Sequence, residues 1–133
     1  MEFEWFDTTI GAPIISVASY GLTFSRSAVQ KMGTPEYVIL GYDKENKIIG
    51  IKTCDKSENK KIEFAGKERG GNVRINSKSF IRFVFSYMEN ENLIQNRAAR
   101  FVGVWNSDQQ LMTLDLKKPL DADEDAEVDT TEE

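Results

Sequence analysis

The sequence predicts an α+β, β-rich fold, either a small barrel or a pair of antiparallel sheets, built from two strand–helix–hairpin units with two helices. Three observations support this prediction. Apolar residues alternate with polar or small ones along several short runs, which is the period of a half-buried strand. Two segments have apolar residues at helical spacing after a residue able to cap a helix. Short polar stretches that suit hairpin turns separate the other β-type runs.

The first unit begins at residue 13. Residues 13–24 alternate in this way, with an interruption near Gly21 where we expect a bend or bulge. Ser25 is a candidate N-cap for a two-turn amphipathic helix, and Gly33 ends that helix because glycine readily takes the left-handed conformation. A hairpin over residues 37–51 follows, with four polar residues at its turn.

The second unit has the same order of elements with different residues. Residues 73–75 alternate, and Asn76 is the candidate N-cap of a longer helix over residues 77–89. A hairpin over residues 101–114 completes the unit. The aromatic residues of the second helix that we expect in the core are Phe80, Phe83 and Phe85.

We expect a single globular domain over residues 1–120, because a chain of 133 residues has the length of one ordinary domain. The units occupy residues 13–54 and 62–118; their hairpins share a spacing but few identities, so an internal repeat and a chance agreement both stay open. Residues 121–133 hold eight of the 22 acids and no base, which predicts a disordered acidic tail. Residues 1–120 then have 17 bases and 14 acids, a net charge of +3 in a chain of net charge −5.

The composition argues against several kinds of chemistry. The chain has no histidine, the commonest general base and a usual zinc ligand, and its one cysteine is Cys54. Residues 66–71 are rich in glycine but lack the order of a phosphate-binding P-loop. We therefore expect no enzymatic activity, no catalytic residue, no cofactor and no metal. The acidic start and the lack of a long apolar run predict a cytoplasmic protein with no membrane contact.

A basic stretch runs from Lys56 to Arg82, with eight bases against three acids and with glycines beside them. Cationic side chains beside flexible backbone are typical of nucleic-acid binding, and a well-solvated loop is the alternative interpretation. The residues expected to contact nucleic acid are Lys60, Lys61, Lys67, Arg69, Arg74 and Lys78, together with Arg26 and Lys31. Trp105, beside a predicted turn, is the candidate for stacking on a base.

A strand and a short helix over residues 21–33, ending in methionine and glycine, precede a hairpin over residues 37–52 whose last strand carries lysine. This layout resembles the AbrB/SpoVT swapped-hairpin DNA-binding domain over about residues 15–53. The chain has Leu22 and Ser25 where that family usually has arginine and proline. The resemblance implies a β-barrel, DNA binding and transcription regulation. It also implies that a homodimer, or the second unit of the same chain, completes the barrel.

Two functions fit these observations. The first is a non-enzymatic nucleic-acid-binding or regulatory protein whose acidic tail modulates a basic body. The second is a protein–protein interaction module, or an accessory factor of the phage type, that binds no nucleic acid. In this second case a protein partner binds an exposed edge or residues 121–133.

Overall fold

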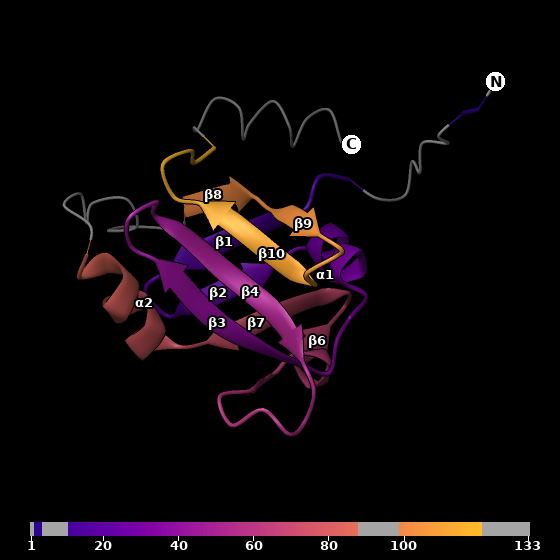
Figure 1. The fold of residues 1–133 in the computed structure, drawn as a ribbon, viewed down its shortest axis with the longest axis horizontal. Coiled ribbons are helices and arrows are strands. Elements are labelled where there is room, and N and C mark those ends of the chain that lie inside the picture. Colours follow the sequence, from indigo (N-terminus) through magenta and orange to yellow (C-terminus); the bar gives the residue numbers. More distant parts are fainter. Residues whose placement is uncertain (1, 4–10, 88–98, 121–133) are drawn as a thin grey trace.

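The computed structural model describes residues 2–3, 11–87 and 99–120, which form two five-stranded antiparallel sheets and two α-helices (Figure 1). Sheet A has the strand order β6 (Glu68–Arg69), β7 (Asn72–Asn76), β2 (Gly21–Phe24), β1 (Ile14–Ala18) and β8 (Ala99–Val102). Sheet B has the strand order β5 (Ile62–Glu63), β3 (Tyr37–Asp43), β4 (Ile48–Cys54), β10 (Leu111–Asp115) and β9 (Val104–Asn106). The helices are α1 (Arg26–Met32) and α2 (Lys78–Phe85), and a 3-10 turn, η1, spans Ala65–Lys67.

The predicted α+β, β-rich class is confirmed, and of the two predicted architectures the chain adopts the paired sheets. The barrel alternative is wrong for the described residues, because their strands divide into two separate sheets that do not close. In Figure 1, β3, β4 and β10 of sheet B lie in front of β1, β2 and β7 of sheet A. Each sheet therefore has one face toward the other sheet and one face directed outward.

The core lies between the two sheets, where the strand register aligns apolar side chains in rows. One row of sheet A consists of Val73, Phe24, Ile15 and Phe101. One row of sheet B consists of Leu40, Ile51, Met112 and Trp105. Phe64, after β5, meets Phe24 edge to face with 5.0 Å between ring centroids. Because successive residues of a strand point to opposite faces, the residues between these positions form the outward faces.

Helix α1 starts and ends as predicted. Ser25 Oγ accepts hydrogen bonds from the backbone N–H groups of Ala28 (3.2 Å) and Ile14 (3.1 Å), which joins the helix start to β1. Gly33 ends the helix in the left-handed conformation, at φ 80°. The apolar side of α1 packs against β1, β2 and β7 of sheet A.

Helix α2 differs from the prediction at its start and in the face that it buries. Asn76 does not cap the helix, because it pairs with Gly21 in sheet A; the cap position is Ser77, whose side chain makes no capping hydrogen bond. The placement of Phe83 in the core is also wrong, since positions 81, 84 and 85 face inward and Phe83 is 48% exposed. Phe85 is buried as predicted. Residues 88 and 89 of the predicted helix lie outside the described residues.

The two predicted units each contribute a strand to the centre of both sheets. β2 pairs with β7 in sheet A, and β4 pairs with β10 in sheet B. In each pair one strand belongs to residues 13–54 and the other to residues 62–118. The internal repeat itself stays a prediction. The predicted tail, residues 121–133, lies outside the described residues.

Candidate nucleic-acid interface

The outward face of sheet A carries a row of polar side chains in register. Arg74 of β7 pairs with Thr23 of β2, Thr23 pairs with Ser16 of β1, and Ser16 pairs with Arg100 of β8. Side chains directly opposite one another on neighbouring strands share a face. Since neighbouring strands lie about 4.8 Å apart, the two arginine Cα atoms stand roughly 14 Å apart with two hydroxyl groups between them.

A second polar row lies beside the first. Arg69 of β6 pairs with Asn72 of β7, which is exposed and two positions from Arg74. The neighbouring Glu68 points the other way, and its Oε2 accepts a hydrogen bond from the Gly71 N–H at 2.5 Å. We define the arginine face as Arg69, Asn72, Arg74, Thr23, Ser16 and Arg100. No carboxylate stands on this face in the described strands of sheet A.

The tip of the β6–β7 hairpin brings a further arginine to one edge of the arginine face. Gly70 (φ 63°) and Gly71 (φ 94°) form a two-residue turn that requires positive φ at both positions. A Cβ atom at Gly71 would lie 2.7 Å from Arg26 Nε, so the Arg26 side chain of α1 rests against the turn. Arg26 and Arg69 therefore flank the same pair of glycines, one from α1 and the other from β6.

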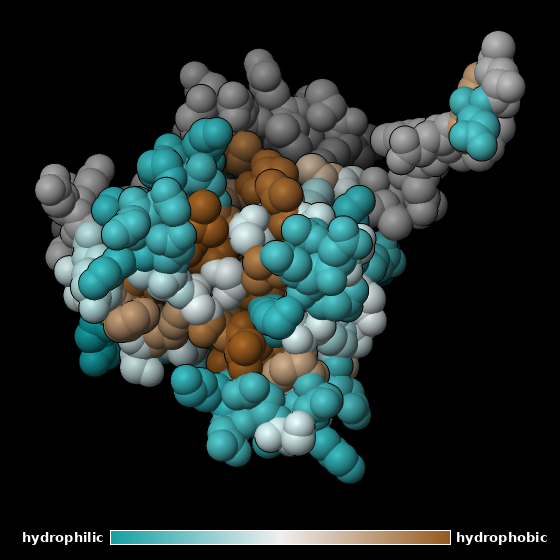
Figure 2. All heavy atoms as spheres, in the orientation of Figure 1, coloured by the Kyte–Doolittle hydropathy of each residue, from teal (hydrophilic) through white to brown (hydrophobic). Residues whose placement is uncertain are grey.

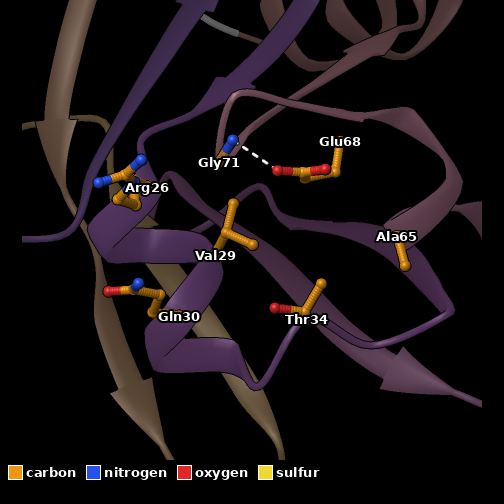
Figure 3. Close-up of a pocket in the computed structure, with 7 residues that line it drawn as sticks. All are labelled: Arg26, Val29, Gln30, Thr34, Ala65, Glu68 and Gly71. Atoms are coloured by element: carbon orange, nitrogen blue, oxygen red, sulfur yellow. Dashed lines mark hydrogen bonds between the residues drawn. The ribbon is translucent and has the colours of Figure 1, made fainter.

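A pocket of about 220 Å³ opens between α1 and this hairpin (Figure 3). Its lining residues are Arg26, Val29, Gln30, Thr34, Ala65, Glu68 and Gly71. Figure 3 shows the Glu68 carboxylate bonded to the Gly71 N–H on one side of the turn and Arg26 on the other. Because the pocket combines one cation with one anion, it is a polar depression beside the arginine face and not an anion site of its own.

Three arginines of this region, Arg26, Arg69 and Arg74, have no acidic partner among the described residues. Arg69 Nη1 donates hydrogen bonds to two backbone carbonyls, those of residues 68 (2.7 Å) and 66 (3.4 Å). The Arg74 guanidinium carbon lies 4.7 Å from the ring centroid of Tyr20, a cation–π contact. These contacts orient the guanidinium groups without neutralising them.

Strand pairing, and not position in the chain, decides which predicted residues come together. Arg69 and Arg74 lie on the arginine face, and Arg26 lies at its edge. The predicted lysines lie elsewhere: Lys31 in the last turn of α1, Lys60 and Lys61 in the loop before β5, Lys67 in η1, and Lys78 at the start of α2. The Lys61 ammonium is 5.8 Å from the ring centroid of Tyr37.

The structure places Trp105 apart from the other candidates and adds Arg100 to them. Trp105 pairs with Met112 and is half-buried on the core side of sheet B, so it lies away from the arginine face. Arg100 was not among the predicted contacts, yet it completes the polar row. No local signal marks Arg100, because its place depends on the pairing of β8 with β1, more than 80 residues earlier in the chain.

An aromatic cluster lies apart from the arginine face, where α2 meets β3. Its rings are Tyr42, Phe80, Phe83 and Tyr87, with 5.5 Å between the centroids of Phe83 and Tyr87. The Lys44 ammonium lies 5.1 Å from the Tyr87 ring centroid. Burial, with the nearby Asp43 carboxylate, raises the pKa of Tyr42, whose hydroxyl is buried without a hydrogen-bond partner in the described structure. Phe83 and Tyr87 are 48% and 43% exposed.

The remaining candidate chemistry gives no second site. Among the described residues, no three metal-ligating side chains come together. Cys54 is a half-buried free thiol; burial, together with Glu58 and Asp55, raises the pKa of the thiol and so disfavours the reactive thiolate. No helix in the described ranges is long and apolar enough to cross a membrane.

No family model, curated protein or solved structure matches this chain. In the structure, residues 15–53 form most of β1, then β2, α1 and the β3–β4 hairpin. The resemblance of this stretch to the AbrB/SpoVT domain stays a prediction.

Proposed function

We propose that this protein binds nucleic acid through the arginine face and catalyses no reaction. The observation that carries the proposal is a sheet face with Arg69, Arg74 and Arg100 and with no carboxylate in its described strands. Contacts from such cations to phosphates supply most of the sequence-independent affinity of a protein for nucleic acid. The net charge of +3 over residues 1–120 has the sign that this function needs.

The spacing of the arginines suits a nucleic-acid backbone laid across the strands. The distance of roughly 14 Å between Arg74 and Arg100 equals about four nucleotides of one strand at about 3.4 Å each. Between the two arginines, half-buried Ser16 supplies a hydroxyl group, whereas Thr23 Oγ1 is buried without a hydrogen-bond partner in the described structure and is not offered to the phosphates. When the Arg74 guanidinium moves to a phosphate, the Tyr20 ring beneath it is free to stack on a base.

The acidic tail adds a means of regulation to this proposal. The Leu120 N–H donates a hydrogen bond to the Arg100 carbonyl at 2.9 Å, so the chain reaches residue 120 beside β8, at the edge of the arginine face. The eight acids of residues 121–133 follow directly. An anionic segment tethered at this point has a high effective concentration at the arginines and competes there with nucleic acid.

The proposal is tested by titrating the full chain into short fluorescent single-stranded and duplex oligonucleotides, with anisotropy as the readout. Arg74→Gln should weaken binding by about tenfold, as expected for the loss of one charge-assisted contact of about 1.4 kcal/mol. The matched control is Lys56→Gln, which removes the same charge from an exposed loop position and should bind as the wild type does. A chain that binds neither oligonucleotide at low salt, with or without its tail, contradicts the proposal.

Protein binding is the second candidate, and the exposed aromatic cluster favours it, because aromatic residues are enriched at protein interfaces. A pull-down from nuclease-treated lysate distinguishes the two functions. Loss of every partner after nuclease supports nucleic-acid binding. Retention of one stoichiometric protein by the wild type, but not by Phe83→Ser, supports protein binding through the cluster.

A further inference from the structure

Two glycines stand side by side at the centre of the outward face of sheet B. Gly41 of β3 pairs directly with Gly50 of β4, which also pairs with Thr113 of β10. Neither glycine has a positive φ. A Cβ atom at Gly41 would meet nothing within 4 Å, and one at Gly50 would make ordinary contact, 3.4 Å, with Leu111 Cδ1. Neither the backbone conformation nor packing against the described residues therefore requires glycine at these positions.

Glycine weakens the interior of a strand, and it is typical of places where another backbone or a ligand approaches closely. At Gly41 and Gly50 the side of the approach is defined, because both positions face away from the core. The missing side chains leave a shallow patch of bare backbone. A flat partner surface can come nearer to the sheet here than at any position that carries a side chain.

The glycine pair lies within an apolar strip. On the same face, Ile39 and Leu111 stand two positions to one side along their strands, and Ile48 stands two positions to the other side. Val104 of β9 pairs with Thr113 and is 64% exposed. We define the glycine strip as Ile39, Gly41, Ile48, Gly50, Val104 and Leu111. Figure 2 shows a hydrophobic band across this face between hydrophilic side chains. Contiguous exposed apolar surface of this kind marks interaction sites.

The charged residues at the two ends of the glycine strip have opposite signs. Lys52 lies between Ile39 and Leu111 at one end, and Asp43 and Asp115 flank Ile48 at the other end. Both ends lie two residues along the strands from the glycine row, by which we mean the paired positions Gly41, Gly50, Thr113 and Val104. Asp115 already pairs with Lys117 at 2.9 Å, whereas the Asp43 carboxylate accepts hydrogen bonds from the turn that follows it and forms no ion pair in the described structure.

This arrangement is complementary to itself. Consider two copies stacked with these outward faces together and related by a two-fold axis parallel to the glycine row. Each strand then lies over the same strand of the other copy, with the ends of the two strands reversed. Lys52 of each copy then lies over Ile48 of the other, beside the Asp43 carboxylate. The same rotation brings the two glycine rows into contact, so the two sheets approach closely.

We propose that the glycine strip is the interface of a two-fold symmetric dimer of this chain. The sheet face is four strands wide and up to seven residues long, roughly 19 Å by 24 Å or about 450 Å² per copy. A standard interface buries about 800 Å² per partner, so the dimer belongs to the weak, reversible class. The arginine face is on the opposite side of the molecule, so the dimer leaves both arginine faces open. This inference does not depend on the proposed nucleic-acid binding.

Sedimentation velocity of the full chain over a wide range of concentrations tests the dimer. Gly41→Glu fits the fold, because its side chain enters open space, but it places a charge at the centre of the interface. The control, Asn59→Glu, makes the same change of charge at an exposed position in the loop after β4, which is not part of the strip. The wild type and Asn59→Glu should dimerise reversibly, while Gly41→Glu should weaken dimerisation by an order of magnitude or more with an unchanged circular dichroism spectrum.

A charge exchange tests the two-fold arrangement itself. Lys52→Glu and Asp43→Lys should each weaken the homodimer, and an equimolar mixture of the two variants should restore association, because opposite charges then meet at both symmetric contacts. Misfolding of either variant cannot restore association. Three results would overturn the proposal: a wild type that is monomeric at every concentration, a dimer that Gly41→Glu leaves unchanged, or a mixture that does not regain association. In the first case, capture of another protein through the strip would assign the strip to that partner.

Discussion

Gly21→Ala tests the contact between β2 and β7 on which the arginine face depends. Gly21 has φ 148°, which side-chain-bearing residues rarely adopt. A Cβ atom there would lie 1.9 Å from the Ile75 carbonyl oxygen and 2.9 Å from the Ser77 nitrogen. Both are backbone atoms, so no change of rotamer relieves the overlap. Either the two strands separate or the backbone of residue 21 changes, and in both cases the pairing of Gly21 with Asn76 is lost.

The expected loss of stability in Gly21→Ala is large because two unfavourable effects act together. A side chain forced into a glycine-only conformation costs about 1–3 kcal/mol, and overpacking costs about 1–3 kcal/mol more. We expect Gly21→Ala to lower the free energy of unfolding by about 3–5 kcal/mol, out of the roughly 5–15 kcal/mol of a typical domain.

The matched control is Gly41→Ala, the same chemical change in an open strand position. Alanine reduces the conformational freedom of the unfolded chain, and its Cβ atom meets no described atom within 4 Å in the folded state. The free energy of unfolding of this variant should therefore equal that of the wild type or exceed it by up to about 1 kcal/mol. Both variants are measured by urea denaturation followed by far-ultraviolet circular dichroism. If the free energy of unfolding of Gly21→Ala lies within about 0.5 kcal/mol of the wild-type value, the β2–β7 register described above is refuted.

Three further predictions concern the cap of α1, the tail and the turn after β3. Ser25→Ala removes the acceptor of two backbone N–H groups and should cost about 1–2 kcal/mol in the same urea assay; an unchanged stability would contradict the capping role. Removal of residues 121–133 should raise the affinity for nucleic acid several-fold at low salt, and the difference from the full chain should shrink as the salt concentration rises. Equal affinities of the two proteins at low salt would exclude competition by the tail. Hydrogen bonds from Asn46 lower the pKa of Asp43 in the folded state. The Asp43 carboxylate therefore contributes its full stabilisation above the unfolded-state pKa of about 3.9, and this stabilisation is lost as the pH falls through the lower folded-state pKa. Urea denaturation from about pH 6 down to pH 3 should therefore show a smaller loss of stability for Asp43→Asn than for the wild type, and equal losses would contradict this assignment.

Local chemistry made part of the fold predictable. The alternation at residues 73–75, the Ser25 cap and the left-handed Gly33 depend on residues close in the chain, and the structure contains each of them. The prediction failed at Asn76, where pairing with Gly21 of a distant strand overrides a local capping preference. It failed again at Phe83, because the amphipathic pattern of α2 does not reveal how much of its aromatic side the core covers.

The candidate site was less predictable than the fold, because strand pairing assembles it. The basic stretch of the sequence contains Arg69 and Arg74, but also lysines that lie outside the arginine face in the folded chain. It misses Arg100, whose place on the arginine face follows from the pairing of β8 with β1. The pairing of Gly41 with Gly50 has no local signal for the same reason, since each glycine alone is an ordinary strand residue.

The salt dependence of nucleic-acid binding tests the central claim most directly. If Arg26, Arg69, Arg74 and Arg100 all contact phosphates of a duplex, the slope of log K against log salt should be about −3.6 for the wild type, from about 0.9 for each contact. The Arg69→Gln/Arg74→Gln double variant should then have a slope of about −1.8, because two contacts are lost. Binding with the same slope for both proteins, or no binding by the wild type at low salt, would contradict the claim that the arginine face binds nucleic acid.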